Sequence, residues 1–325
     1  MKAIVFEKYG PPSILQLKEV EKPVPGDNEI LVKIHAAAAN PLDWHRMRGE
    51  PFLVRLSDGF KKPKDPMLGV DIAGRVEAIG RDVTQFKPGD DVFGDCGWAG
   101  GFAEYVCVTE KNIIQKPVNI TFGEAAAVPA AAFTALQGLR DRGRIQAGQK
   151  VLINGASGGV GTFAVQIAKS YGAEVTGVCS TRNLDMVRSI GANDTIDYTQ
   201  DDFTRLGQNY DLIYDAVGNR SVFDYKRALK SEGTCVITGF STLTRLFQHM
   251  LLGPLVSMTG SRKICTQGVA KPNQKDLVFI KELLESGKIK PMIDRCYTLS
   301  QTAEAIGYLE QGHARGKVVI NIELQ

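Results

Sequence analysis

Clustered cysteine is missing from this sequence. Its 325 residues include only six cysteines, and the nearest two in the chain, Cys96 and Cys107, stand eleven positions apart. No Cys-x-x-Cys pair exists, which argues against a zinc lobe held by clustered thiols. Cysteines this sparse are typical of proteins in a reducing compartment.

Long hydrophobic runs are also missing. The longest, Met250 to Met258, spans nine residues and is interrupted by Gly253-Pro254, whereas a membrane span needs about 20. The first ten residues, MKAIVFEKYG, contain no apolar core of signal-peptide length. We therefore expect a soluble, cytoplasmic protein with no membrane partner.

An excess of one charge is absent too. Thirty-nine Lys and Arg face 36 Asp and Glu, a net charge of +3, and no basic run exceeds Lys61-Lys62. Such a balance gives no reason to expect a specific nucleic-acid partner. The small-molecule partner that we expect is indicated by motifs further along the chain. The 43% hydrophobic and 23% charged composition is ordinary for globular proteins, and the length fits about two domains.

The first 120 residues follow a β pattern. Short strands are predicted at 2–6, 30–35 and 74–79, and Pro-Gly pairs at 25–26 and 88–89 mark turns. Regular short strands separated by turns favour a small barrel or sandwich.

From about residue 123 the pattern changes. A helical stretch rich in small residues runs through Leu139 and is followed by alternating strands and helices. The strands are expected at 151–153, 174–179, 210–214 and 234–238, and the helices at 162–171, 184–190 and 221–229. Alternation of this kind predicts an α/β fold with a doubly wound parallel sheet. Two more helices, the first capped by Asn273 and ended by Gly287, and a strand at 317–322 complete the chain.

A glycine-rich loop follows the strand at 151–153. Gly155, Gly158 and Gly161 are spaced three apart, and a helix begins at once after them. Glycines at this junction let the backbone approach a pyrophosphate, and the helix start offers free N–H groups to it. Because the loop has both a strand before it and a helix after it, the sequence predicts nucleotide binding rather than a plain tight turn.

The end of the next strand indicates which dinucleotide binds. An NAD site needs an acidic side chain there for the ribose 2′-hydroxyl, yet residues 180–183 are Ser-Thr-Arg-Asn. Ser180 and Arg182 are instead suited to a 2′-phosphate, since Arg makes bidentate contacts to phosphate. We predict NADP(H) rather than NAD(H). The alternative is a polar turn with a solvated Arg182.

Taken together, several motifs resemble the zinc-independent branch of the medium-chain dehydrogenase/reductases, the quinone oxidoreductase (zeta-crystallin-like) family. They are Asn40-Pro-Leu-Asp43, Gly69-Val-Asp71-Ile-Ala-Gly74, Ala103-Glu-Tyr105, Gly155-Ala-Ser-Gly-Gly-Val-Gly161 and Gly312-His-Ala-Arg-Gly-Lys317. The resemblance implies a GroES-like β-barrel catalytic domain at 1–122 and 271–325, with a Rossmann domain at 123–270. It also implies a homodimer and a nicotinamide site in the cleft between the domains.

The resemblance also assigns cofactor-binding residues. Ser157, Gly158, Gly159 and Val160 would hold the pyrophosphate, and Ser180 and Arg182 the 2′-phosphate. The remaining five are Tyr198 near the adenosine end, Val217 and Phe240 after later strands, Thr134 near the nicotinamide, and Lys317 in the C-terminal motif. For Tyr198, Thr134 and Lys317, packing or surface charge is the alternative.

The zinc ligands of the zinc-dependent branch have no counterpart here. That branch has a cysteine where this chain reads Ala-Asn-Pro-Leu-Asp at 39–43, and Gly-His-Glu where it reads Gly69-Val-Asp71. We therefore expect no metal site. Without a Lewis acid, hydride transfer favours quinones and α,β-unsaturated carbonyls, in which the negative charge delocalises.

Two polar residues are the candidates for catalysis, Asn40 and Asp43. The resemblance places Asn40 near the nicotinamide, and Asp43 would support a donor or the ribose; an Asx turn around Pro41 is the alternative. The enzyme itself has alternatives: an NADP-dependent alcohol dehydrogenase, or a non-catalytic NADPH-binding sensor or structural protein. The apolar segment 243–258 is expected to form either a lid or a dimer interface.

Overall fold

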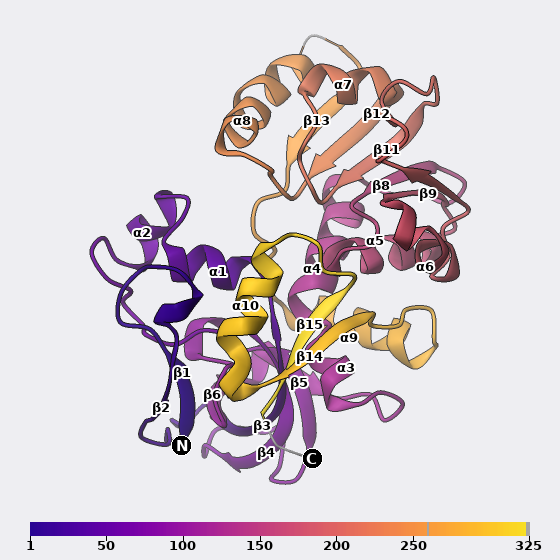
Figure 1. Ribbon diagram of the computed structural model, residues 1–325. Helices are drawn as coiled ribbons and strands as arrows, with labels where there is room; N and C mark the ends of the chain where they lie inside the picture. The colour runs from indigo at the N-terminus through magenta and orange to yellow at the C-terminus, as the bar shows by residue number, and fades with distance from the viewer. Residues whose placement is uncertain (259, 323–325) are drawn as a thin grey trace. The chain divides into compact units, whose positions relative to one another are not determined.

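The computed structural model of the chain describes residues 1–258 and 260–322 (Figure 1). Its contacts divide the chain into two compact units. The first consists of residues 1–131, 272–286 and 291–325, and the second of 132–271 and 287–290. The division between the units at 131/132 falls within helix α4 (Pro129–Gln137), whereas the sequence predicts the domain limit at 122/123.

The first unit is built around a seven-stranded sheet. Its strands follow the order β14-β15-β3-β4-β5-β7, with β6 also pairing with β3, and a separate hairpin pairs β1 with β2. The bounds are β1 Lys2–Val5, β2 Gln16–Glu19, β3 Glu29–Ala39, β4 Asp71–Ile79, β5 Asp91–Asp95, β6 Tyr105–Thr109, β7 Ile113–Gln115, β14 Ile293–Thr298 and β15 Lys317–Asn321.

Strand β3 is longer than its composition predicts. The predicted strand ends at His35, where the alternation stops before four alanines, and alanine is depleted in strands. In the structure Ala36–Ala39 continue the strand, since all four pair with β15, with Ala39 opposite Val318, and Ala36–Ala38 also pair with β4. Long-range pairing therefore overrides the local preference of these alanines.

Helices cover this sheet and join its strands. They are α1 Pro41–Arg48, α2 Leu53–Asp58, α3 Phe122–Ala126, α9 Gln274–Glu285 and α10 Thr302–Glu310, with short 3-10 turns at Pro12–Ile14, Gly97–Ala99, Glu110–Asn112 and Leu299–Gln301. The predicted cap of α9 is confirmed: the Asp276 N–H donates to the Asn273 side chain over 2.9 Å. The predicted stop is also there, because Gly287 has a φ of 68° just after the helix.

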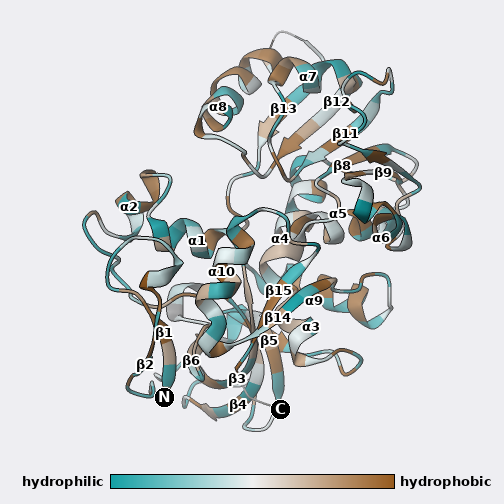
Figure 2. Cartoon of the chain, viewed as in Figure 1, coloured by the Kyte–Doolittle hydropathy of each residue, from teal (hydrophilic) through white to brown (hydrophobic). Residues whose placement is uncertain are grey.

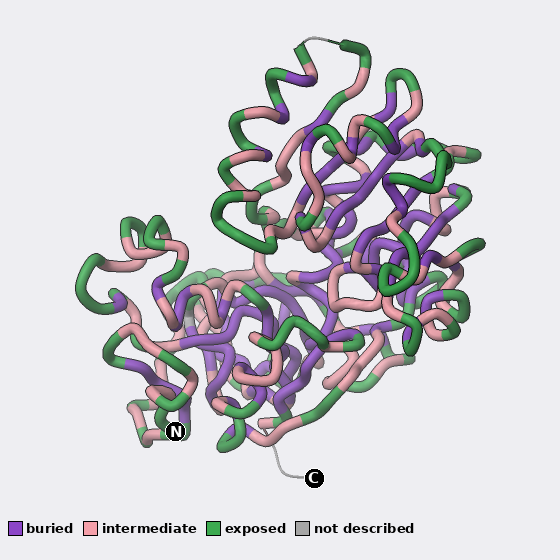
Figure 3. Tube along the Cα trace, turned by 45° about the horizontal axis from the view of Figure 1, so that its top comes forward, coloured by how far each residue is buried: buried purple, intermediate pink, exposed green. Residues whose placement is uncertain are grey.

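The second unit contains the predicted parallel sheet. Its order is β10-β9-β8-β11-β12-β13, and every pair is parallel. Numbered along the chain this is 3-2-1-4-5-6, the order of doubly wound dinucleotide-binding sheets. The strands are drawn largely as buried in Figure 3, and their bounds are β8 Lys150–Asn154, β9 Glu174–Cys179, β10 Asp194–Asp197, β11 Tyr210–Asp215, β12 Leu229–Ile237 and β13 Lys263–Thr266.

The helices of this unit are α4, α5 Gly159–Ser170, α6 Leu184–Ser189, α7 Val222–Ala228 and α8 Leu243–Met258, with a π-helical turn at Gly138–Arg142 and a 3-10 turn at Thr181–Asn183. The apolar segment 243–258 is thus a helix rather than an irregular loop. His249, Gly253 and Val256 are its buried residues, and the helix packs against β13.

The other face of α8 is exposed and apolar, and Figure 2 colours several turns of this helix as hydrophobic. Six large side chains on it are 48–82% exposed: Leu243, Phe247, Met250, Leu251, Leu255 and Met258. Whether this face forms a lid or a dimer interface stays a prediction. Within the described parts of the chain, no helix is both long and apolar enough to cross a membrane.

Candidate functional site

The glycine-rich loop joins β8 to α5 at the carboxyl end of the parallel sheet. Two of its glycines are required by the fold itself. Gly155 has a φ of 80°, and a Cβ there would come within 2.7 Å of the Val217 side chain. At Gly161 a Cβ would lie 2.0 Å from the Gly155 carbonyl oxygen. These two glycines let the strand turn sharply into the helix.

Gly158 has no such internal reason to be glycine. It precedes α5 with φ −82° and ψ 173°, a conformation open to any residue. A Cβ on it would meet only the Gly155 oxygen, at 3.4 Å. The missing side chain therefore leaves room beside the start of a 12-residue helix, where N–H groups and the helix dipole favour an anion. This geometry fits a dinucleotide pyrophosphate.

Asn183, which we did not predict, connects the loop to the end of β9. Its buried side-chain amide donates to Ser157 Oγ and to Ser180 Oγ, both at 3.1 Å. Two predicted residues from different strand ends are therefore brought together. Arg182 lies two residues after Ser180, in the same 3-10 turn as Asn183, and its side chain is exposed. In the sequence, the only sign of this link is the asparagine that ends the Ser-Thr-Arg-Asn stretch at 180–183.

An acidic residue lies close to the predicted 2′-phosphate site, on the neighbouring strand. Asp197 ends β10, and its carboxylate accepts from Thr181 Oγ1 at 2.5 Å and from the Thr199 N–H and Oγ1. The Thr181 hydrogen bond is the main reason that the pKa of Asp197 is lowered. The sequence argument examined only the end of β9 and missed this carboxylate, which a parallel sheet brings alongside.

The remaining predicted cofactor residues of this unit lie after neighbouring strands. Tyr198 follows β10 with its side chain half exposed, and its N–H donates to the Cys179 carbonyl. The Val217 N–H donates to Asp215 at the end of β11 over 2.7 Å. Phe240 follows β12 and is partly buried. Thr134 lies on α4.

The first unit contains a buried polar cluster built on three of the predicted residues. Lys317 Nζ lies 2.5 Å from Asn40 Oδ1 and 3.1 Å from Asp71 Oδ2. The Asn40 amide donates to Asp71 Oδ2 at 2.9 Å. Asp43 accepts from the Asn40 N–H at 2.7 Å and from the Gly69 N–H at 3.2 Å. All four residues of the cluster are at most 4% exposed.

Three acidic side chains of this region, those of Asp43, Asp95 and Cys96, have raised pKa values. Burial, reinforced by the charge of Asp71, raises the pKa of Asp43 to about 7 despite two backbone N–H donors. Burial and Asp71 likewise raise the pKa of Asp95, at the end of β5, to about 7. The pKa of the buried Cys96 thiol is also raised by burial and by the neighbouring carboxylates. The region can therefore hold protons near neutral pH.

The cluster does not have the ligands of a metal centre. No group of three or more His, Cys, Asp or Glu side chains arranged to bind a metal occurs among residues 1–258 and 260–322. His45 lies outside the cluster: its Nδ1 is 2.7 Å from the Glu50 carbonyl and its ring lies against Trp44. The absence of zinc stays a prediction.

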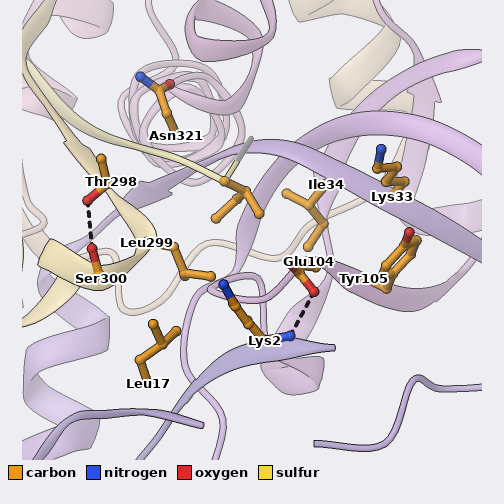
Figure 4. Close-up of a pocket in the computed structure, with 11 residues that line it drawn as sticks. Lys2, Leu17, Lys33, Ile34, Glu104, Tyr105, Thr298, Leu299, Ser300 and Asn321 are labelled. Carbon is orange, nitrogen blue, oxygen red and sulfur yellow. Dashed lines mark hydrogen bonds between the residues drawn. The ribbon is translucent and has the colours of Figure 1, made fainter. Parts of the chain in front are cut away.

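A separate surface cavity of about 720 Å³ lies in the first unit (Figure 4). It is lined by Lys2, Leu17, Lys33, Ile34, Glu104, Tyr105, Thr298, Leu299, Ser300, Asn321 and Ile322. Asn321 ends β15, whereas Lys317 begins it. No residue that we predicted to be functional lines this cavity.

Comparison with known proteins places these features in a family. Residues 26–118 match the alcohol dehydrogenase GroES-like domain, and residues 190–320 match the zinc-binding dehydrogenase domain. The 2-methylene-furan-3-one reductase of Solanum lycopersicum is 35% identical, over 99% of this chain and 79% of its own length. The chain belongs to the medium-chain dehydrogenase/reductases, in their quinone oxidoreductase group.

Two further members of this family resemble the chain over most of its length. The chloroplastic NADPH-dependent alkenal/one oxidoreductase of Arabidopsis thaliana is 34% identical, over 98% of this chain and 79% of its own. The quinone oxidoreductase structure from Coxiella burnetii superposes with a TM-score of 0.88 at 32% identity, covering 99% of both chains. As a member of this family the chain is an oxidoreductase, and its predicted α/β fold with a GroES-like domain is confirmed.

Proposed function

We propose that this chain is an NADPH-dependent oxidoreductase that reduces a quinone or an α,β-unsaturated carbonyl compound without zinc. The observation that carries the proposal is the space at Gly158, at the start of α5. The neighbouring residue Ser157 is linked to Ser180 through the side-chain amide of Asn183, which donates a hydrogen bond to each serine. Pyrophosphate and 2′-phosphate binding residues are thereby held in one unit. When bound, NADPH supplies the hydride.

The residues proposed for each part of the cofactor are those expected from the sequence. Ser157, Gly158, Gly159 and Val160 hold the pyrophosphate, Ser180 and Arg182 the 2′-phosphate, and Tyr198 the adenosine end. The choice of NADPH over NADH rests on Arg182. Asp197 is the nearby carboxylate that could bind the ribose hydroxyl of NADH, but its oxygens already accept hydrogen bonds from Thr181 and Thr199. The name of one relative, the NADPH-dependent alkenal/one oxidoreductase of Arabidopsis thaliana, supports the same choice.

The substrate class follows from what the buried cluster provides. It offers the ammonium of Lys317 but no set of metal ligands, so it can stabilise negative charge on an oxygen by hydrogen bonding. Quinones and enones require only such a hydrogen bond to the oxygen that becomes negative. Their charge delocalises after hydride addition, and water can supply the last proton. Relatives named for furanone, alkenal and quinone reduction agree with this class.

A substrate panel tests the proposal. In the reducing direction, purified protein is given NADPH or NADH together with either 9,10-phenanthrenequinone or an alkenal. In the oxidising direction, it is given NADP⁺ together with secondary alcohols. We expect NADPH oxidation with the quinone or the alkenal. Activity with alcohols alone would instead indicate an alcohol dehydrogenase, and NADPH binding without any turnover would indicate a sensor or structural protein. We also propose that the protein is cytoplasmic and forms a homodimer.

A further inference from the structure

Asp71 is a fully buried carboxylate to which we have so far assigned no role. It begins β4 and accepts hydrogen bonds from three segments that are distant in the sequence. Its Oδ1 accepts from the Ala130 N–H at 2.8 Å, in the first turn of α4. Its Oδ2 accepts from the Asn40 amide and from the Lys317 ammonium. One carboxylate thus joins the start of α1, α4 and β15.

These contacts fix the orientation of the Asn40 amide. An ammonium only donates, so the Asn40 atom facing Lys317 must be the oxygen. The amide nitrogen then donates one hydrogen to Asp71 and the other to the Ala38 carbonyl, at 3.1 Å. Both amide hydrogens are used. Asn40 therefore cannot donate to a ligand unless it breaks one of these bonds.

Lys317 is different, because its ammonium has three hydrogens. The structured part of the chain supplies two acceptors for them, Asn40 Oδ1 and Asp71 Oδ2. One hydrogen on a buried side chain, 3% exposed, is left for an oxygen outside the protein. A buried ammonium also needs a counter-charge. Asp71 is the ion-pair partner that the described residues provide.

We propose that Asp71 is a positioning residue of the reaction, which holds the Lys317 ammonium and the Asn40 amide so that Lys317 donates its remaining hydrogen to a ligand oxygen. This inference rests on the proposed function. The oxygen belongs either to the nucleotide or to the carbonyl of the hydride acceptor, and the two sources give different results below.

The test is a double-mutant cycle on Asp71→Asn and Lys317→Met. NADPH affinity is measured by fluorescence titration, and the single-turnover rate of NADPH oxidation is measured at saturating NADPH and quinone. Each single variant is expected to lose about 10- to 100-fold, the scale of a hydrogen bond to a charged group. A loss in affinity assigns the oxygen to the nucleotide, and a loss in rate assigns it to the acceptor.

The double variant gives the decisive comparison. Because Asp71 acts through Lys317, the double variant should lose no more than about 3-fold beyond Lys317→Met alone. Asp276→Asn is the matched control: it replaces another buried carboxylate of the first unit, one that accepts from the Asn273 side chain in the first turn of α9, and should change neither quantity by more than about 3-fold.

Two results would overturn the role of Asp71: wild-type behaviour of Asp71→Asn, or losses that multiply in the double variant. If Asp71→Asn alone does not fold, the double variant, in which both charges are removed together, is compared with Lys317→Met. A wild-type protein that neither binds NADPH nor transfers hydride contradicts the proposed function instead.

Discussion

The space at Gly158 can be tested by adding a single methyl group. In Gly158→Ala the new Cβ lies 3.4 Å from the Gly155 oxygen, an ordinary contact, and the backbone conformation is allowed. Stability should therefore change by about 1 kcal/mol or less. The methyl group nevertheless occupies the space proposed for the pyrophosphate. Loss of one charge-assisted hydrogen bond costs about 1.5–3 kcal/mol, so NADPH should bind roughly 10- to 100-fold more weakly.

Gly161→Ala is the matched control for this change. Its Cβ would lie 2.0 Å from the same Gly155 oxygen, a backbone atom that cannot move aside without shifting the loop. This variant should be destabilised by about 1–3 kcal/mol or more. Urea unfolding gives the stability of both variants, and fluorescence titration gives NADPH affinity. If Gly158→Ala bound NADPH as tightly as the wild type, the space would not be the pyrophosphate site.

Four other predictions can be checked independently. Arg182→Ala should weaken NADPH binding by about 1–3 kcal/mol and leave NADH binding unchanged; equal losses in isothermal titration would contradict the 2′-phosphate assignment. Exhaustive chelation should leave activity and folding intact, and stoichiometric zinc in elemental analysis would refute metal independence. Because the pKa of Asp95 is raised from 3.8 to about 7, its protonated form stabilises the fold, fully below pH 3.8, and this contribution is lost as pH rises through about 7. Relative to Asp95→Asn, the wild type should therefore lose about 2 kcal/mol of unfolding free energy between pH 5 and pH 7, and parallel curves would argue against a raised pKa. If α8 is a dimer interface, Phe247→Asp should sediment as a monomer with normal NADPH affinity, whereas a higher KM for bulky quinones at unchanged mass would indicate a lid.

The features that the sequence predicts well are those governed by local pattern. The strand at 174–179 is found with the same bounds, and the helix after the glycine loop begins only three residues earlier, at Gly159 instead of Thr162. Periodicity and glycine spacing act over a few residues, so no knowledge of the fold is needed. The short strands β10, β13 and β14 were not predicted, because four to six partly exposed residues give little periodic signal.

The parts of the site that were missed depend on distant segments meeting. Asp71 was quoted only as a family motif, and nothing local shows that it contacts residues 31 and 246 positions away. Asn183 and Asp197 likewise gain their meaning from neighbouring strand ends. Lys317 was expected to reach the cofactor; the structure shows its ammonium bound to Asn40 and Asp71, and its part in cofactor binding stays a prediction.

The position of β15 has a consequence for synthesis on the ribosome. This strand is made after the whole of the second unit, yet it lies between β14 and β3 within the sheet of the first unit. Until it arrives, Ala36–Ala39 of β3 keep an unpaired edge, a site prone to wrong pairing. Asp71 also waits for its counter-ion, because Lys317 comes with the same strand. We therefore expect the nearly continuous second unit to fold during translation, and the first to be completed only after most of the chain has emerged.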